Sequence, residues 1–192
     1  MTLYRDADLE IVDKPVGIGV TAGRDDERSL AADRGLLVCH RLDVGTSGVL
    51  VLARTPGGQR QISEAFANGD VEKEYLAVCA GPLADDGIID VPLGEWKRGR
   101  VQIGKGRPAR TRFEVTERAN GRCRVMLRPE TGRTHQIRAH LCSVGAPIVG
   151  DEDYGGPPAP RILLHALRVV LPWPRPGDRL VVTAPEPPGF HP

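Results

Sequence analysis

Short apolar runs, broken by glycine, proline and charged residues, set the pattern of this chain and predict mostly strands. Residues 36–39 and 49–53 are apolar at successive positions, which is typical of strands covered on both faces. The run at 71–79 places Tyr75 on one face of a third strand, because side chains alternate along a strand with a period of two. Further short strands are predicted at residues 3–4, 9–12, 88–91, 162–171 and 180–183.

A β-hairpin is predicted on the two sides of the Asn120-Gly121 dipeptide. This dipeptide favours the positive φ angles of a tight turn, and strands are expected at residues 111–116 and 123–127. One face of the second strand is therefore apolar. Along it, Cys123, Val125 and Leu127 alternate with Arg124, Met126 and Arg128.

Helical periodicity is confined to a few segments. Residues 57–68 place Ile62, Ala65 and Phe66 on one face, and Gly69 follows as a C-terminal stop. A second helix is expected to be capped by Thr134 and to run to Val144, a polar segment at 24–34 predicts a short third one, and residues 81–106 are loop-rich.

Many strands in hairpin order, with few helices, indicate the α+β class. We expect a single domain over residues 1–192, built on a mixed, mainly antiparallel β-sheet flanked by a few helices. With 40% hydrophobic residues in 192, the chain can bury a core of its own.

Targeting signals and cysteine spacing both point to the cytoplasm. The chain does not open on a basic segment followed by an apolar stretch, and no apolar run approaches the roughly 20 residues that cross a bilayer. The four cysteines are widely spaced, which favours reduced thiols over a disulfide framework. We expect a cytoplasmic protein that does not enter a membrane.

Charge is distributed unevenly although the formal net charge is only +1. Residues 97–138 carry 13 basic and three acidic residues, whereas the rest of the chain carries 13 basic and 22 acidic residues. This asymmetry predicts a basic face for a polyanion. A general preference of the source genome for Arg would explain why Arg outnumbers Lys, but it would not explain why acids are scarce in this one stretch.

A single carboxylate, Asp43, lies between two apolar runs in the segment His40-Arg41-Leu42-Asp43-Val44-Gly45-Thr46-Ser47-Gly48. A carboxylate in this position is costly to desolvate unless a partner holds it. It can serve as a turn cap that accepts hydrogen bonds from the following amides. It can also take part in chemistry directly. Arg41 would then help to keep the carboxylate ionised, as a nucleophile or base requires.

Two residues elsewhere in the chain favour a chemical role for Asp43. Arg138 is expected at the edge of a buried helix face, where an arginine usually has an ion-pair partner, and Asp43 is our candidate. The alternative is a surface arginine. Tyr75 is either a core aromatic with its hydroxyl near water or a residue that stacks on a base and moves a proton.

The sequence offers no pattern for a metal or an organic cofactor. His135 and His140 are five residues apart, which does not place them on one helix face, and no Cys/His cluster of zinc type occurs. The glycines near Gly17 lack the strand-to-helix context of a dinucleotide site. We therefore expect no cofactor.

Five segments form a longer pattern. They are Asp13-Lys14-Pro15-x-Gly17, the segment around Asp43, Lys73-x-Tyr75-x-Ala77, Thr131-Gly132-Arg133-Thr134-His135-Gln136-Ile137-Arg138-x-His140-Leu141, and Pro147-Ile148-Val149-Gly150-Asp151. In order and approximate spacing these segments resemble the RluA-type family of pseudouridine synthases, and the resemblance covers nearly the whole chain.

The resemblance implies isomerisation of uridine to pseudouridine in ribosomal or transfer RNA, without a metal or organic cofactor. It implies that Asp43 is the essential aspartate, Tyr75 the active-site tyrosine and Arg138 the arginine that pairs with the aspartate. Arg41 matches an arginine that helps to occupy the space left by the flipped nucleotide. We expect further contacts with RNA from Lys14, Arg110, Arg124, Arg133, His135 and Gln136.

The chain departs from the family pattern at its start. Many relatives carry a small RNA-binding domain before the catalytic one, whereas here the first strand is expected at Leu3. We therefore expect RNA to be bound by the catalytic domain itself, acting as a monomer, or with a partner that the sequence does not identify. Two rival functions remain, namely a non-catalytic RNA-binding protein on the same scaffold and a metal-dependent RNA hydrolase that uses Asp43 and the histidines.

Overall fold

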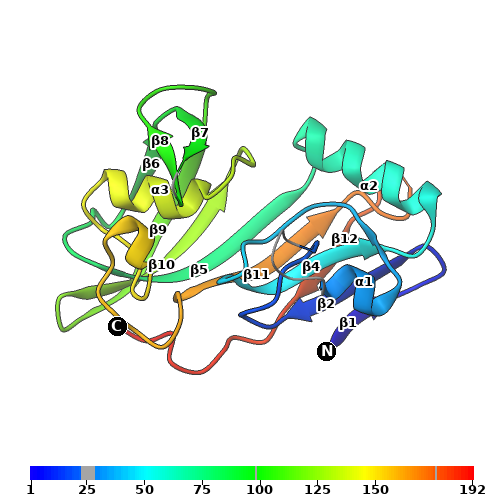
Figure 1. Ribbon diagram of the computed structural model, residues 1–192, viewed down its shortest axis with the longest axis horizontal. Coiled ribbons are helices and arrows are strands. Elements are labelled where there is room, and N and C mark those ends of the chain that lie inside the picture. Colours follow the sequence, from blue (N-terminus) through cyan, green and yellow to red (C-terminus); the bar gives the residue numbers. More distant parts are fainter. Residues whose placement is uncertain (23–28, 98, 176) are drawn as a thin grey trace. The chain divides into compact units, whose positions relative to one another are not determined.

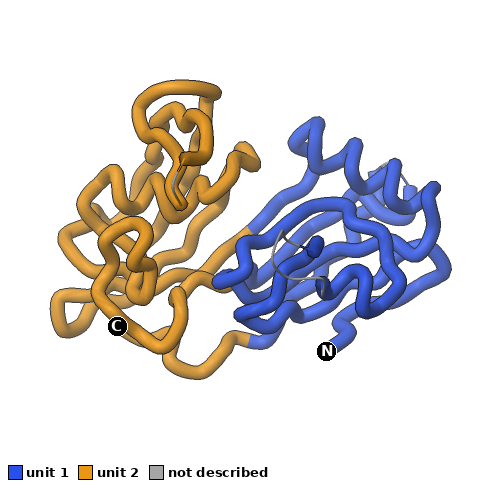
Figure 2. Tube along the Cα trace, in the orientation of Figure 1, with its two compact units in different colours: residues 1–73, 166–185 blue, residues 74–165, 186–192 orange. Residues whose placement is uncertain are grey.

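The structure is a computed structural model that describes residues 1–22, 29–97, 99–175 and 177–192. The chain divides into two compact units (Figure 2). Unit 1 comprises residues 1–73 and 166–185, and unit 2 comprises residues 74–165 and 186–192. Each unit is therefore built from two separate stretches of sequence.

Unit 1 is organised around a sheet with the strand order β1-β2-β4-β11 (Figure 1). Strand β3 pairs with β4, and β12 pairs with β11. The strands are β1 (Thr2–Arg5), β2 (Leu9–Lys14), β3 (Leu37–Val38), β4 (Ser47–Ala53), β11 (Leu164–Leu171), which enters this unit at residue 166, and β12 (Leu180–Thr183).

The core of unit 1 lies on β4, which is buried at every position. This confirms the prediction for residues 49–53 of a strand covered on both faces. The strand predicted at residues 36–39 is present as β3, over Leu37–Val38 only. The prediction that it is covered on both faces was wrong, because both residues are half-buried.

Helix α2 (Pro56–Asn68) packs its apolar stripe into the unit 1 core. Thr55 caps its N-terminus by accepting a hydrogen bond from the Gly58 N–H, and Gly69 ends it with a left-handed φ of 85°. Glycine reaches this conformation without steric cost, so the predicted stop is confirmed. Helix α1 (Leu30–Arg34) lies in the polar segment predicted to be helical, and residues 24–28 of that segment lie outside the described residues.

Unit 2 contains a sheet with the strand order β5-β10-β9-β6 and a separate two-stranded sheet, β7-β8 (Figure 1). The predicted hairpin is β9 and β10, joined by Asn120 and Gly121 at φ angles of 53° and 72°. The strands are β5 (Glu72–Ala80), β6 (Asp86–Asp90), β7 (Leu93–Lys97), β8 (Arg100–Ile103), β9 (Arg110–Ala119) and β10 (Arg122–Pro129).

Helix α3 (Gln136–Ser143) covers the apolar face of β10, the face that the alternation of apolar and polar residues along this strand predicts. The prediction that Thr134 caps this helix was wrong. His135 is the residue that precedes the helix, in a left-handed conformation with φ 52°, and it makes no side-chain capping bond. The short 3-10 helix η1 (Glu152–Tyr154) follows α3.

The β7-β8 hairpin lies in the segment that the sequence pattern assigned to loops. Its two apolar anchors, Leu93 and Val101, are buried in a cluster with Tyr154 and Ala139. Tertiary packing therefore stabilises strands that have little periodicity of their own.

The predicted α+β class, with a mixed, mainly antiparallel sheet and few helices, is confirmed. Among the described pairings, β1 with β2, β2 with β4, β5 with β10, β9 with β10, β6 with β9, β11 with β12, β3 with β4 and β7 with β8 are antiparallel. That residues 1–192 act as one domain stays a prediction. Among the described residues, no helix has both the length and the apolar character needed to span a membrane.

Candidate active site

Asp43 lies in unit 1, in the loop that joins β3 to β4. The Thr46 N–H donates to the main-chain carbonyl of Asp43 at 3.0 Å and closes a turn. Leu42 and Thr46 on either side are buried, whereas Asp43 is half-buried and Arg41 is exposed. The loop is thus anchored on both sides of the carboxylate.

Lys14, the last residue of β2, binds the same loop from the protein interior. Its side chain is fully buried, and Nζ donates to the carbonyls of Pro15, Ile18 and Val44 at 2.9, 3.0 and 3.3 Å. The Gly17 N–H donates to the same Val44 carbonyl at 2.9 Å. A buried ammonium needs such partners, and this one ties the 15–18 segment to the residue after Asp43.

His40 fixes the other end of the loop. Its Nε2 accepts a hydrogen bond from the Val51 N–H at 2.9 Å, and its ring stacks on Phe66 at a centroid distance of 4.2 Å. Burial, together with the nearby Lys73 ammonium, lowers the pKa of His40 to about 3. The imidazole is therefore neutral at physiological pH and can act as the acceptor that Val51 requires.

Gly48 ends the motif where only glycine fits. Its φ is 107°, and a Cβ at this position would lie 2.1 Å from the Ala166 carbonyl oxygen. Both the backbone conformation and the close approach of β11 therefore exclude a side chain.

Tyr75 and Arg138 lie in unit 2, on β5 and α3. Tyr75 pairs with Leu127 of β10 and is half-buried at the edge of the apolar cluster that α3 covers. The expected pairing of Arg138 with Asp43 stays a prediction.

The Arg138 side chain is only 5% exposed and is held by acids of its own unit. Its Nε and Nη2 bind the two carboxylate oxygens of Asp151 at 2.7 Å each, a bidentate geometry. Nη2 also bonds Asp153 at 2.9 Å, and Nη1 lies within 3.2 Å of the His135 ring nitrogens. The guanidinium is thus fixed in orientation before any substrate binds.

Gln136, which we expected to contact RNA, is buried and engaged on both ends of its amide. Its Nε2 donates to the Arg110 carbonyl and to Thr111 Oγ1, each at 3.0 Å. Its Oε1 accepts from Thr131 at 2.7 Å and from the Arg133 N–H at 3.0 Å. The side chain therefore attaches the 131–135 loop to β9.

Five of the basic residues on β9 and β10 are ion-paired with acids, namely Arg110, Arg112, Arg118, Arg124 and Arg128. Arg110 approaches Glu130 at 3.4 Å, and Arg124 bonds Glu186. Local acids thus offset much of the predicted basic face of this sheet. Arg118 pairs with Asp85, and Arg128 pairs with Glu74.

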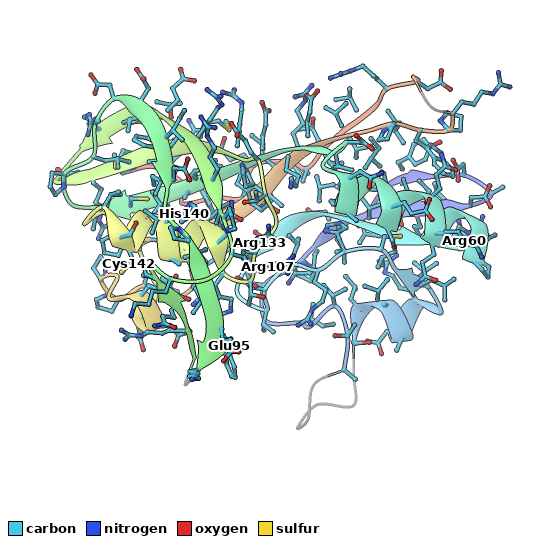
Figure 3. All side chains as sticks on the ribbon, turned by 90° about the horizontal axis from the view of Figure 1, so that it is seen from above. Arg60, Glu95, Arg107, Arg133, His140 and Cys142 are labelled. Atoms are coloured by element: carbon cyan, nitrogen blue, oxygen red, sulfur yellow. The ribbon has the colours of Figure 1, made fainter. Side chains whose placement is uncertain are left out.

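A second group of basic residues is exposed without such compensation. Lys105 and Arg107 follow the β7-β8 hairpin, are exposed, and form no ion pair with any described acid. Arg133 is close to them, because its Nε donates to the carbonyl of Pro108 at 3.0 Å (Figure 3). Lys105 and Arg107 thus carry positive charge that no ion pair with a described acid offsets.

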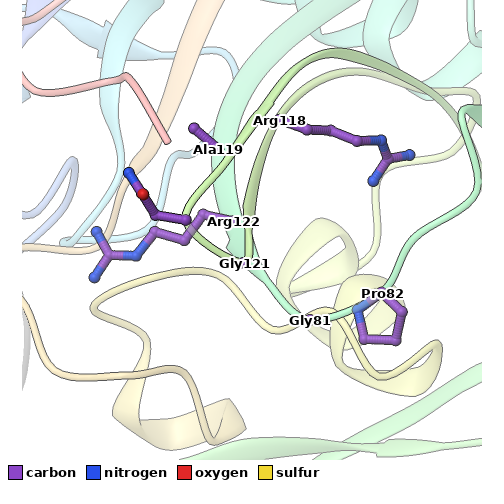
Figure 4. Close-up of a pocket in the computed structure, with 7 residues that line it drawn as sticks. Gly81, Pro82, Arg118, Ala119, Gly121 and Arg122 are labelled. Atoms are coloured by element: carbon purple, nitrogen blue, oxygen red, sulfur yellow. The ribbon is translucent and has the colours of Figure 1, made fainter.

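An open hollow of about 550 Å³ lies at the β9-β10 turn, beside Gly81 and Pro82 (Figure 4). None of the site residues predicted from the sequence lines it. The Arg118 side chain at its rim is engaged by Asp85 at 2.8 Å. We therefore assign it no part in the chemistry.

The structure groups the predicted residues by unit. Unit 1 brings Lys14, Arg41 and Asp43 into one loop system. Unit 2 brings the other residues around the start of α3 and the strands beneath it, namely Arg110, Arg133, His135, Gln136 and Arg138, with Tyr75 and Arg124 on β5 and β10.

Comparison with known proteins identifies the family. Residues 8–143 match the family model described as RNA pseudouridylate synthase. The chain belongs to this family. An uncharacterized RNA pseudouridine synthase of Zymomonas mobilis is 42% identical to this synthase over 185 residues, which cover 85% of this chain and 84% of the relative. The dual-specificity RNA pseudouridine synthase RluA of Escherichia coli K12 is 36% identical over 200 residues, covering 95% and 91%.

Solved structures agree with the fold of the synthase. The human RNA Pseudouridylate Synthase Domain Containing 1 superposes with a TM-score of 0.83 at 27% identity, covering 97% of this chain and 83% of the human chain. The predicted resemblance to the RluA-type family is confirmed, and the synthase is an isomerase that acts on RNA.

Sequence reasoning did not single out two residues that shape the site. Asp151 was noted only as the end of a motif, and Tyr154 was not noted at all. A buried carboxylate beside a Gly-rich turn is a signal that could have identified Asp151 as the ion-pair partner of Arg138. Tyr154 leaves no such signal, because its role depends on contacts distant in sequence.

Proposed function

We propose that this synthase isomerises specific uridines of ribosomal or transfer RNA in the cytoplasm, with Asp43 as its catalytic carboxylate. The observation that carries the proposal is the Asp43 loop, in which a half-buried acid stands between the buried Leu42 and Thr46, and in which the buried Lys14 ammonium binds the main-chain carbonyl of the next residue, Val44. The match of residues 8–143 to the RNA pseudouridylate synthase family supports a chemical role for this acid.

A uridine in folded RNA must leave its stack before a half-buried group can reach it. Arg41, exposed two residues before Asp43, would occupy the vacated space. Asp43 would then attack the ribose or the base, or remove a proton from the sugar. The bond from ribose to the base nitrogen breaks, the base rotates, and a carbon–carbon bond forms in its place.

Tyr75 would stack on the uracil during this rotation and accept the proton that leaves carbon five. Arg138 would keep Asp43 ionised and oriented through a charge-assisted contact. A guanidinium already fixed by Asp151 can do this without reorganisation. No step of this sequence calls for a metal or an organic cofactor.

The RNA contacts divide into two kinds. Arg133 and His135 are half-buried at the surface and are proposed to touch RNA directly, as are Arg110 and Arg124 if RNA displaces their acid partners. Lys14 and Gln136 are buried, with their polar atoms bound to protein groups. For these two we propose that they shape the RNA-contacting loops rather than bind RNA.

Tritium release tests the proposal. RNA that lacks the modification is labelled at carbon five of uridine and incubated with wild type, Asp43→Asn and the matched control Asp70→Asn, each with and without EDTA. Asp70 is an exposed acid at the end of α2. Wild type and Asp70→Asn should release tritium, whereas Asp43→Asn should release none and still bind RNA.

Each other outcome has a definite meaning. Release near the wild-type rate by Asp43→Asn would remove Asp43 from its role. Release by no variant, with RNA bound by all of them, would favour a non-catalytic RNA-binding protein. Activity lost on addition of EDTA would favour the metal-dependent hydrolase.

A further inference from the structure

Arg138 is enclosed by groups that fix its guanidinium from several sides. Asp151 and Asp153 bind Nε and Nη2. The ring of Tyr154 lies against the guanidinium, with 5.0 Å between Cζ and the ring centroid. Because Asp151 is fully buried and Tyr154 is 3% exposed, water does not compete for the contacts that these two residues make with Arg138.

The hydroxyl of Tyr154 extends this enclosure to a different element. Its oxygen accepts a hydrogen bond from the Val101 N–H of β8 at 2.9 Å and lies 3.2 Å from Nδ1 of His135. A phenol has one proton to donate. With the Val101 N–H directed at the oxygen, that proton is available for Nδ1, and His135 in turn lies within 3.2 Å of Arg138 Nη1.

The β7-β8 hairpin is anchored at the same place. Leu93 and Val101, its buried residues, share one cluster with Tyr154 and with Ala139 of α3. At the outer side of the hairpin, Trp96 is 57% exposed. The hairpin thus rests on Tyr154 from Leu93 at its open end to Val101, which pairs with Trp96 beside its turn.

We propose that Tyr154 is a positioning residue that ties the orientation of the Arg138 guanidinium to the placement of the β7-β8 hairpin. This inference rests on the proposed function, in which Arg138 acts on the catalytic carboxylate. A shift of β8 breaks the bond to the Tyr154 hydroxyl, which frees His135 and loosens the ring against Arg138. RNA that contacts the hairpin therefore acts on the network that orients Arg138.

The test compares Tyr154→Phe, which removes a single oxygen, with Tyr4→Phe. Tyr4 lies in unit 1, where its hydroxyl donates to Asp6 at 2.7 Å, so the control removes a similar bond elsewhere. Under single turnover, Tyr154→Phe should isomerise uridine about tenfold more slowly, with an RNA Kd within about twofold of wild type. Tyr4→Phe should keep the wild-type rate.

A double-mutant cycle separates positioning from a merely structural role. If Tyr154 acts through Arg138, Tyr154→Phe should have no further effect on the rate in an Arg138→Lys background. Additive losses would overturn the inference, and so would a wild-type rate for Tyr154→Phe alone. A wild-type rate for Arg138→Lys would instead remove Arg138 from the proposed function, so the two failures are distinguishable.

A second measurement needs no variant at position 154. In wild type, the Tyr154 hydroxyl proton should exchange slowly with water by NMR, because it is buried between Val101 and His135. A hydroxyl proton in fast exchange would show that the bridge is not held, and would overturn the inference even if Tyr154→Phe did not fold.

Discussion

The ammonium group of Lys14 donates to the main-chain carbonyl of Val44, the residue that follows Asp43, at 3.3 Å. Two more carbonyls, of Pro15 and Ile18, share the same ammonium. A lysine at the end of β2 thus fixes the backbone beside the candidate catalytic carboxylate without reaching the surface. One buried charge thus connects the end of β2 to the loop that carries Asp43.

Removal of this charge should loosen the loop and lower stability. In Lys14→Met the side chain keeps its length, but three main-chain carbonyls lose the buried ammonium as a donor, so we expect the free energy of unfolding to fall by about 2 kcal/mol. Urea denaturation measures this, with Lys97→Met as the control, since the Lys97 side chain is 81% exposed. Equal stability of both variants would contradict the assigned role.

The glycine that closes the Asp43 motif should not tolerate alanine. Gly48→Ala places a Cβ against the Ala166 carbonyl at a positive φ, and we expect a loss of about 3 kcal/mol or more in unfolding free energy. Gly57→Ala is the matched control, because the nearest atom would lie 4.0 Å from its Cβ and its φ is not positive. That control should stay within about 1 kcal/mol of wild type.

Acid should weaken the fold through His40. Its pKa is about 3 in the folded chain and about 6.5 in the unfolded chain, so between these values the unfolded state binds one more proton. The contribution is therefore present above pH 6.5 and is lost as the pH falls towards 3, at up to about 1.4 kcal/mol per pH unit. In His40→Gln the free energy of unfolding should depend less steeply on pH, because unfolding then takes up one proton fewer. Parallel stability curves for the two proteins from pH 7 to pH 4 would contradict the assignment.

RNA affinity should depend more on uncompensated arginines than on paired ones. Arg107→Ala removes an exposed charge without a described acid partner, and should reduce the salt dependence of log Kd by about one unit of slope. Arg124→Ala removes a charge that Glu186 already offsets, and should reduce it less. Filter binding at several salt concentrations measures both slopes, and a larger change for Arg124→Ala would reverse this ranking.

Hydrophobic periodicity predicted the elements whose signals lie within their own stretch of sequence. The α2 helix, its Gly69 stop and the β9-β10 hairpin follow from residues within a few positions of one another. The β7-β8 hairpin did not follow, because Leu93 and Val101 are stabilised by Tyr154, which lies about fifty residues further along the chain. The position of the α3 start was also missed, because His135 takes a left-handed conformation that is uncommon for residues other than glycine.

For the site, the motifs identified the chemical groups but not their neighbours. Asp43, Tyr75 and Arg138 were singled out by residue type and position, the resemblance assigned their roles, and their shared role stays a prediction. Burial could not be inferred for Lys14 and Gln136, since polar residues in motifs usually face solvent. Their buried hydrogen bonds show that a motif residue can act on the backbone of a loop instead.

The interleaving of the two units bears on how the chain folds during synthesis. Residues 166–185 are needed to complete unit 1, and they leave the ribosome only after the 74–165 stretch of unit 2. Unit 1 therefore cannot be completed until residues 74–165 have been synthesised, and until then the edge of β4 that pairs with β11 stays unpaired. Vectorial synthesis favours late, concerted folding here, and neither unit can be excised as one continuous fragment for separate expression.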